Sequence, residues 1–269
     1  MLKVSELYIH PIKSLGGISL QSAEVTDRGL KHDRRWLLVD GNNCFFTQRD
    51  FPRMTFLKTN ISDGILEVSE KNNPINKIEI PIGKFTDEVL QVKIWDDAVA
   101  ANVVDKRFNK WFSDFLGINC KLVYMPDETK REVSKEHAKE NEIVSFADGF
   151  PFLIIGQSAL DDLNRRLTNS VPITNFRPNI VFTGGDAFEE DNWSEIRIGE
   201  MTFFAVKPCA RCVITTIDQE TAAKNKEPLA TLSTYRRKGS KILFGENLIH
   251  KGTGQINVGD EIKIISHKE

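Results

Sequence analysis

The first hundred residues contain many short apolar stretches separated by turn signals, and this pattern restricts the fold more than any other feature. Residues 3–10 alternate weakly and end at Pro11, where a central strand must stop. The apolar run 35–39 is followed by Asp40-Gly-Asn-Asn43, and Ser62-Asp-Gly64 precedes another alternating segment. Asp-Gly and Asn-rich turns between apolar runs indicate β-hairpins. Short strands at this close spacing predict a barrel or a sandwich.

Helical periodicity replaces the alternating pattern in two clear segments. The aromatic residues of 108–115 recur at helical spacing, Asp105 can cap the start of that helix, and Gly117 can end it. A second helix is expected over 156–168, with its leucines on one apolar face and Ser158 as its N-cap.

The second half of the chain also favours strands. Its apolar segments are mostly short and β-branched, and residues 213–217 are among those expected to be strands. The highly charged residues 126–142 predict an exposed loop or a weak helix, and a short helix is expected within 227–236. The chain is therefore predicted to be mainly β with a few helices (α+β), in two β-rich, barrel-like domains at 1–105 and 106–269.

Composition narrows the classes of partner. Hydrophobic residues make up 40% of the chain and charged residues 28%, which is enough apolar material for a core, and the formal net charge is -2. No overall attraction to a nucleic acid polymer follows from that charge. No apolar run is long enough for a membrane span. The first ten residues resemble a strand more than a secretion signal, so we expect the protein in the cytoplasm.

Cys209-Ala-Arg-Cys212 is the segment best suited to chemistry, although a lone CxxC fits several kinds of site. Structural zinc needs about four ligands, and no second cysteine or histidine pair is present to supply them. A thioredoxin-like pair requires a helix N-terminus, whereas residues 213–217 predict a strand. Two buried thiols in a core strand are a third alternative. Lys207 and Arg211 favour thiolate, so one thiolate on a metal with non-protein ligands is the fourth.

Three other segments carry polar groups that suit an anion. Lys13-Ser14 ends the first strand before two glycines, without the Walker spacing of a P-loop, and an ordinary turn is the alternative. Arg34 follows Asp33 directly and can simply pair with it. Arg177 lies between a helix and an apolar strand, where an unpaired charge is costly. A carboxylate such as Asp148 or a phosphate group would satisfy that arginine.

Motifs along nearly the whole chain occur in the order of a known family. They are His10-Pro-Ile-Lys-Ser14, Asp33-Arg34, Phe46-Thr-Gln-Arg49, Ser145-Phe-Ala-Asp-Gly-Phe-Pro-Phe152, Asn175-Phe-Arg-Pro-Asn179, Asp191-Asn-Trp193, Lys207-Pro-Cys-Ala-Arg-Cys-Val-Ile-Thr-Thr216, Glu227-Pro-Leu229, Phe244-Gly-Glu-Asn247 and Val258-Gly-Asp260. On these motifs the chain resembles the MOSC-domain proteins, named for the C-terminal domain of molybdenum-cofactor sulfurase, with their β-rich N-terminal domain. The resemblance is to the branch that contains the mitochondrial amidoxime-reducing component and its bacterial relatives.

The resemblance implies a molybdopterin-type cofactor held between the two β-rich parts, the second of which would be a MOSC β-barrel. The metal-binding and catalytic cysteine of the family matches Cys212, and Cys209 matches a position that is not a ligand. Asp148 matches a residue that could orient the pterin or relay a proton. The family positions that hold the pterin and its phosphate match Lys13, Ser14, Arg34, Asp148, Arg177 and Asn179, with Arg211 as a further candidate. The resemblance therefore implies phosphate binding similar to that of pyridoxal-phosphate sites.

The activity implied by the resemblance is the two-electron reduction of small N-hydroxylated molecules, such as amidoximes, hydroxylamines and N-hydroxylated bases. Some bacterial relatives carry a ferredoxin domain after the MOSC domain, and this sequence does not. Cys44 and Cys120 cannot complete an iron–sulfur cluster at their spacing. A separate flavin or iron–sulfur electron-donating protein is therefore expected. The alternatives are a carrier of the cofactor or of its sulfur, and a metal-free fold with a structural CxxC.

Overall fold

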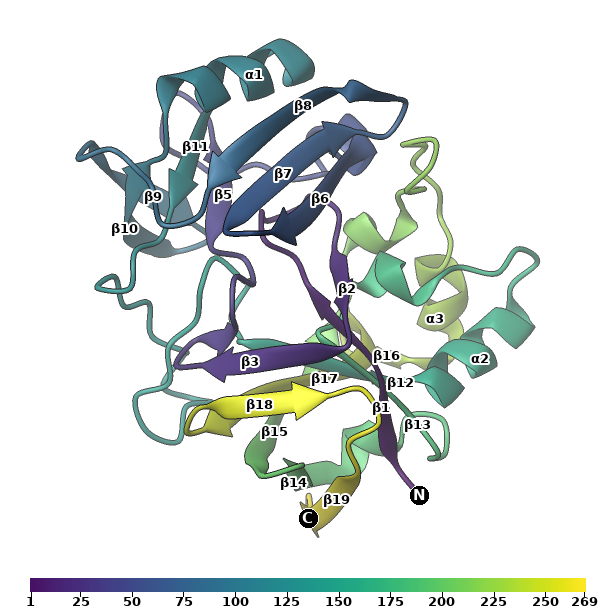
Figure 1. Ribbon diagram of the computed structural model, residues 1–269. Helices are drawn as coiled ribbons and strands as arrows, with labels where there is room; N and C mark the ends of the chain where they lie inside the picture. The colour runs from purple at the N-terminus through teal and green to yellow at the C-terminus, as the bar shows by residue number, and fades with distance from the viewer.

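The computed structural model describes residues 1–269 and confirms the mainly β prediction, with 43% of the residues in strands and 17% in helices. Two groups of sheets lie one above the other in Figure 1. The upper group holds a three-stranded meander and a four-stranded sheet. In sheet order these are β6 (Leu57–Ser62), β7 (Ile65–Glu70) and β8 (Asn73–Pro81), then β5 (Trp36–Val39), β11 (Lys121–Tyr124), β10 (Asp97–Val103) and β9 (Val89–Ile94).

The lower group is dominated by a nine-stranded sheet. Its order is β19 (Ile262–His267), β14 (Trp193–Ile198), β15 (Met201–Ala210), β17 (Lys241–Lys251), β12 (Phe152–Gly156), β13 (Ile180–Thr183), β1 (Lys3–Ile9) and β2 (Ile18–Leu20), with β16 (Arg237–Lys238) on β17. A small sheet lies beside it, formed by β18 (Gly254–Asn257), β3 (Ser22–Thr26) and β4 (Gly29–Leu30).

The elements that follow the predicted boundary pack with the N-terminal sheets. Helix α1 (Lys106–Leu116) and strand β11 follow residue 105, and both lie in the upper group, where Phe108 and Phe112 share a core with Trp36. The aromatic face of α1 is thus buried against the N-terminal sheets, and the division into domains at residue 105 stays a prediction. Conversely, β1 pairs antiparallel with β13 in the lower group (Figure 1).

The helix signals were mostly confirmed. The Asp105 side chain accepts from the Arg107 backbone N–H, and Gly117 closes α1 in the left-handed conformation with φ of 73°. Helix α2 (Gln157–Arg166) and helix α3 (Leu229–Tyr235) lie in the two other predicted segments. Ser158 is not the N-cap of α2, because the helix begins one residue after Gly156 and the Ser158 hydroxyl donates to the Asp186 carbonyl.

The segment predicted as a strand at residues 213–217 forms a short 3₁₀ helix instead, η4 (Val213–Thr216). The hydroxyls of Thr215 and Thr216 donate to the carbonyls of Cys212 and Val213, at 3.0 and 2.8 Å. These local bonds give the backbone an alternative to a sheet ladder, which outweighs the β propensity of the residues. Three further 3₁₀ turns are η1 (Pro52–Phe56), η2 (Ile173–Phe176) and η3 (Glu189–Asn192).

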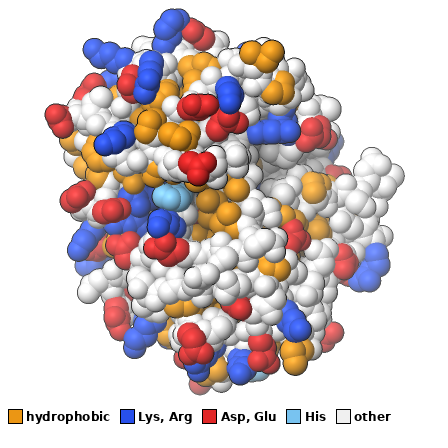
Figure 2. All heavy atoms as spheres, in the orientation of Figure 1, with side chains coloured by type: hydrophobic (Ala, Val, Ile, Leu, Met, Phe, Trp, Pro, Cys, Tyr) orange, Lys and Arg blue, Asp and Glu red, His pale blue; other side chains and the backbone are white.

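Residues 126–142 contain no helix or strand, in agreement with the predicted loop, but they are not wholly exposed. Arg131 and Val133 are buried, and Glu132 forms an isolated bridge with Ile143. On the face shown in Figure 2, acidic and basic side chains are interspersed, which agrees with the near-neutral composition. None of the helices combines the length and the apolar character that crossing a lipid bilayer demands.

Candidate functional site

A cavity between the two groups of sheets contains all eight residues predicted for the site. Its open space is about 770 Å³, including the part continuous with solvent. The predicted residues on its wall are Lys13, Ser14, Arg34, Asp148, Arg177, Asn179, Arg211 and Cys212. They come from the turn after β1, from the loops before β5, β12 and β13, and from the segment after β15. The roles assigned to them stay predictions, but their convergence in one place is a structural fact.

The two cysteines of the CxxC segment have different surroundings. Cys212 is exposed and is the first residue before η4, whereas Cys209 is half-buried near the end of β15. The Arg211 guanidinium donates to the Cys209 sulfur at 2.8 Å and to the Phe176 carbonyl at 2.6 Å. Burial nevertheless raises the pKa of the Cys209 thiol above its usual value. The Arg211 cation is therefore hydrogen-bonded to Cys209, whereas the sulfur of Cys212 is the more accessible of the two in the cavity.

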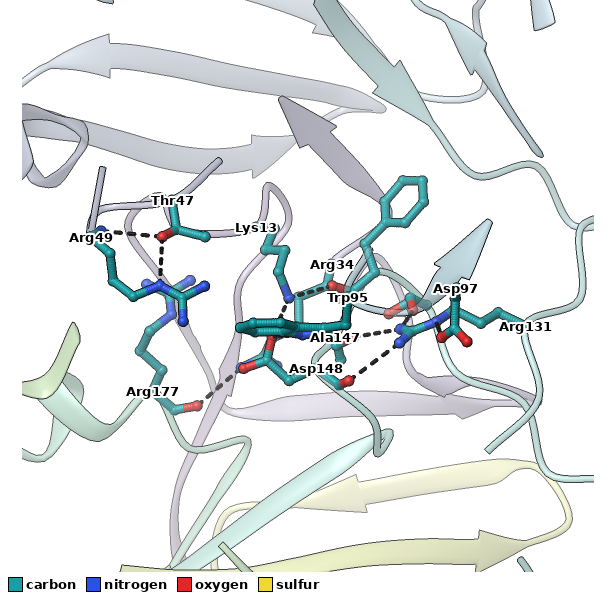
Figure 3. A network of polar contacts seen from close by, with 12 residues as sticks. Lys13, Arg34, Thr47, Arg49, Trp95, Asp97, Arg131, Ala147, Asp148 and Arg177 are labelled. Carbon is teal, nitrogen blue, oxygen red and sulfur yellow. Dashed lines mark hydrogen bonds and ion pairs between the residues drawn. The ribbon is translucent and has the colours of Figure 1, made fainter. Parts of the chain in front are cut away.

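Lys13 and Asp148 form the ion pair at the centre of the site (Figure 3). Lys13 Nζ donates to Asp148 Oδ1 at 2.5 Å and to the Phe146 carbonyl at 2.8 Å, and the Trp95 indole N–H donates to the same carboxylate at 3.2 Å. Neighbouring protein atoms oppose ionisation of Asp148, although its side chain is largely exposed, yet Lys13 and Trp95 hold the pKa of its carboxyl well below the usual value. Asp148 is therefore ionised at neutral pH.

Arg34 and Asn179 join the two groups of sheets. The Arg34 guanidinium pairs with Asp33, as the sequence allowed, and also donates to Asn179 Oδ1 and to the Arg177 carbonyl, each at 3.1 Å. The Asn179 amide N–H₂ donates in turn to the Tyr8 carbonyl at 3.2 Å. Neutral amide and carbonyl groups thus fix the cation in place, with one carboxylate as its only ionic partner.

Arg177 has no carboxylate partner, so the suggested pairing with Asp148 is not formed. Its Nη1 donates to the Leu15 carbonyl at 2.6 Å, and its Nη2 is buried without any hydrogen-bond partner. Burial, together with the neighbouring charge of Arg34, lowers the pKa of Arg177 to about 9. A buried cation of this kind is costly in isolation, and an anion in the cavity would stabilise it.

Backbone strain also concentrates around the cavity. Ser14, Arg34 and Arg177 adopt left-handed conformations with φ of 68°, 49° and 54°. Such conformations are uncommon for residues with side chains and cluster at functional sites. Ser14 and Arg34 lie in turns and Arg177 follows η2 directly, and all three line the cavity. The sequence could not predict this feature, because none of the three is glycine or asparagine.

Arg49 and Trp95 contact the site but were not predicted as site residues; Arg49 lines the cavity, whereas Trp95 lies outside its wall and reaches Asp148. Arg49 donates through Nε to the Thr47 hydroxyl at 3.1 Å, and its guanidinium lies 4.7 Å from the centre of the Trp95 ring (Figure 3). Arg49 belongs to a recognised motif, which was the available signal. Trp95 had none, since it lies at the tip of the β9–β10 hairpin and is brought to Asp148 only by the fold.

Comparison with known proteins supports the two-part architecture. Residues 1–119 match the family model for the MOSC N-terminal beta barrel domain, and residues 141–263 match the MOSC domain. The segment between the two matches contains β11, which completes the upper group of sheets.

Similar proteins match almost the whole chain. Mitochondrial amidoxime-reducing component 1 of Mus musculus is 32% identical over 280 residues, covering 97% of this chain and 82% of that protein. The human protein of the same name is 31% identical with the same coverage. Molybdenum cofactor sulfurase of Oryza sativa is 30% identical over 266 residues, which cover 91% of this chain and 32% of the sulfurase. The chain belongs to the MOSC-domain family, with the family's N-terminal β-barrel domain preceding its MOSC domain.

Proposed function

We propose that this protein binds a molybdenum cofactor through Cys212 and reduces N-hydroxylated compounds with electrons from a separate protein. The observation that carries the proposal is the exposed Cys212 sulfur on the wall of a cavity in which two arginines, Arg177 and Arg211, have no carboxylate partner and each keep a buried N–H without an acceptor. The relatives named amidoxime-reducing components supply the class of reaction. The word component in their names fits a system that includes a separate electron donor.

The residues present fit a phosphate-bearing, anionic cofactor. Arg177 Nη2 and Arg211 Nε are buried N–H groups without acceptors, and both residues line the cavity. Planar guanidinium groups suit phosphate oxygens, since they can donate two parallel hydrogen bonds. Three or more His, Cys, Asp or Glu side chains do not come together anywhere as a metal site. A metal at Cys212 would therefore take its other ligands from the cofactor.

The bound cofactor would supply a molybdenum centre that exchanges two electrons, so that an N-hydroxy group, two protons and two electrons yield an N–H group and water. The residues of the chain itself would hold the cofactor and orient it. Cys212 provides the thiolate ligand, and Arg34, Arg177 and Arg211 bind the phosphate. Asp148 is already ionised by Lys13 and Trp95. As a carboxylate, it would accept hydrogen bonds from N–H groups of the cofactor and help to orient it.

The decisive experiment measures reduction and metal content in the same preparation. Protein purified with its cofactor should contain about one molybdenum per chain, release a pterin on denaturation, and reduce benzamidoxime with reduced methyl viologen as electron donor. The same preparation of Cys212→Ala should lose both molybdenum and activity. A preparation fully loaded with molybdenum that reduces neither benzamidoxime nor a hydroxylamine would contradict the proposal.

The similarity to molybdenum cofactor sulfurase favours one alternative, a carrier that binds the cofactor or its sulfur and passes it on. A carrier would show no turnover and would release its cofactor to a molybdenum-free acceptor enzyme. Incubation of the loaded protein with such an acceptor, followed by an assay of the acceptor's activity, distinguishes the two functions.

A further inference from the structure

A second hollow, here called the vestibule, adjoins the cavity at Asp148. The two hollows share Asp148, Gly149, Phe150, Cys209 and Asn247 on their walls. The open space of the vestibule is about 1140 Å³, including the part continuous with solvent. A molecule in it would lie against the residues that also bound the cavity of Cys212. The vestibule therefore lies directly against the wall of the cavity that holds the proposed metal position.

Trp95 forms one aromatic wall of the vestibule, and its backbone adopts a strained conformation there. Ile94 and Asp97 pair across the β9–β10 hairpin, so Trp95 and Asp96 make its two-residue turn. Glycine or asparagine is usual in such a turn, but Trp95 adopts φ of 54° with a bulky side chain. A conformation of this kind costs about 1 to 3 kcal/mol, and residues that keep it tend to serve a site.

Other side chains fix the indole of Trp95, yet it remains 49% exposed. Arg49 covers its ring at 4.7 Å, Phe45 meets it edge-on at 5.1 Å, and its N–H donates to Asp148 at 3.2 Å. Phe150 supplies a second aromatic side chain to the same hollow. A fixed, half-exposed aromatic ring stabilises planar ligands by stacking and cations through its π face.

The charges of the vestibule differ from those of the cavity. Its carboxylates are Asp96, Asp97, Glu132 and Asp148, and its fixed cations are Arg131 and Lys207, while His137 adds charge only when protonated. The carboxylates therefore outnumber the fixed cations, whereas cations dominate the cavity.

The charge of Arg131 is already paired within the protein. Its guanidinium binds Asp97 at 2.7 Å and donates to the Asp148 carbonyl at 3.2 Å (Figure 3). It also donates to the Ser145 carbonyl at 3.0 Å. Asp148 is paired with Lys13. Asp96 and Glu132 are both exposed, and neither forms an ion pair. The unpaired groups of the vestibule are therefore these two carboxylates and one cation, Lys207 beside the Phe150 ring, so the carboxylates remain in excess for a positively charged ligand.

We propose that the vestibule is the substrate-binding site and that it prefers planar N-hydroxylated compounds bearing a positive charge over those bearing a carboxylate. Trp95 and Phe150 would contact the planar group, and Asp96 and Glu132 would select its charge. This inference rests on the proposed function, because it assigns the substrate site of the same reaction. A cofactor phosphate belongs instead among the arginines of the cavity, since the unpaired carboxylates of the vestibule repel it.

Three benzamidoximes test the charge preference on the cofactor-loaded enzyme: unsubstituted benzamidoxime, its cationic 4-aminomethyl derivative and its anionic 4-carboxy derivative. We expect kcat/KM to be highest for the cationic compound and lowest for the anionic one. In the double variant Asp96→Asn/Glu132→Gln, the ratio of cationic to anionic kcat/KM should fall about fivefold, the size expected for two exposed charges.

Asp87→Asn is the matched control, because Asp87 is an exposed carboxylate that lines neither hollow and forms no ion pair. Its charge ratio should equal that of the wild type. An unchanged ratio in the double variant, or an equal fall in Asp87→Asn, would overturn the inference. If the double variant folds poorly, each single substitution should still lower the ratio.

Trp95→Phe and Trp95→Ala separate the ring from its hydrogen bond. Stacking predicts that Trp95→Ala raises KM for all three compounds by about tenfold, and that Trp95→Phe recovers most of that loss. Equal KM increases in the two variants would assign Trp95 only the role of holding Asp148 and would remove it from the substrate site.

Binding of a product analogue distinguishes failure of this inference from failure of the proposed function. Calorimetry on the loaded protein should show that 4-(aminomethyl)benzamidine binds more weakly to Asp96→Asn/Glu132→Gln. Turnover of benzamidoximes without any effect of these substitutions would refute the vestibule alone. Carboxylate-dependent amidine binding without turnover of any N-hydroxylated compound would refute the proposed function and leave a cation-binding vestibule.

Discussion

The cavity and the vestibule share a wall, but their charged groups are built in different ways. The cavity cations Lys13, Arg177 and Arg211 are fixed by backbone carbonyls and are largely withdrawn from water. The unpaired vestibule carboxylates, Asp96 and Glu132, lie on a hairpin tip and a loop and are exposed. Buried charges act strongly because water does not screen them, whereas exposed charges act weakly. The first arrangement suits a resident ligand, and the second suits ligands that exchange.

Removal of the Cys212 thiol should have the largest effect on activity, because this thiol distinguishes the cavity from an ordinary anion site. Cys212→Ala should abolish molybdenum binding and lower activity by more than about a hundredfold, because the proposed metal has one protein ligand. Molybdenum content and benzamidoxime reduction measure this. Cys209→Ala should be milder, since its sulfur is half-buried against Arg211. Loss of metal from the Cys209 variant alone would reverse the assignment.

The next effect separates cofactor binding from folding. Arg177→Gln should lower molybdenum content about tenfold. It should change the unfolding free energy of the cofactor-free protein by less than about 1 kcal/mol, because the lost hydrogen bond to Leu15 is offset by relief of a buried charge. Denaturant titration of the cofactor-free protein supplies that second quantity.

Arg236→Gln is the control for that variant. Arg236 pairs with Asp191 at 2.6 Å outside the cavity, so its loss should destabilise the fold by about 3 kcal/mol without selective loss of molybdenum. If Arg177→Gln instead destabilises cofactor-free protein as much as Arg236→Gln does, Arg177 is structural.

Salt should sharpen the contrast between the two regions. Raising the ionic strength from about 0.02 to 0.5 M shortens the screening length from roughly 20 Å to a few ångströms. The preference of the vestibule for the cationic benzamidoxime should then shrink about threefold, while molybdenum content stays constant. Salt-dependent loss of molybdenum would show that the cavity charges are as accessible as those of the vestibule.

Glu190 and Glu246 form a third charged region, outside the cavity and the vestibule. Substitution there shows whether the charge effects of those two regions are local. Burial raises the pKa values of Glu190 and Glu246 to about 7, and the charged groups that face them are Asp191, Arg236 and Lys268. In the unfolded chain these carboxyls titrate near 4.5, so the native state holds the extra protons between about 4.5 and 7. Their contribution to stability is complete below that range and is lost as pH rises through about 7.

Unfolding free energy should therefore fall between pH 5.5 and pH 8 by about 2 kcal/mol for each carboxyl. In Glu190→Gln the fall should be smaller, because one titrating group is gone, and the charge preference of the vestibule should not change. A wild-type pH profile identical to that of Glu190→Gln would show that Glu190 does not titrate in this range.

Local signals in the sequence predicted the parts of the fold that depend on local chemistry. Asp105 and Gly117 define α1, and the Asp-Gly turn before β7 forms a hairpin as expected. The prediction of a strand at residues 213–217 was wrong, because the hydroxyl-to-carbonyl hydrogen bonds of Thr215 and Thr216 in η4 outweigh β propensity. The domain boundary after residue 105 stays a prediction, because composition does not show which sheets bury the aromatic face of the helix that follows it.

The candidate site was predictable only where a motif named it. The family motifs assigned Lys13, Arg34, Arg177 and Cys212 to a single site, and all four line one cavity. Trp95 could not be found this way, since its role depends on a hairpin tip meeting Asp148 across the molecule. The vestibule is likewise a product of packing between segments that are far apart in the chain.

Strand β1 connects the start of the chain to a sheet whose other large members are made much later. A ribosome delivers β1 long before β13, its partner, so β1 has an unpaired edge while the upper sheets can already form. The Lys13-Ser14 turn follows β1 directly and is joined to the upper group, where the Lys13 backbone N–H donates to the Trp36 carbonyl at 2.9 Å. Cys212 is synthesised later still. If Cys212 holds the proposed cofactor, loading would follow synthesis of most of the polypeptide, and any factor that delivers the cofactor would meet a nearly finished protein.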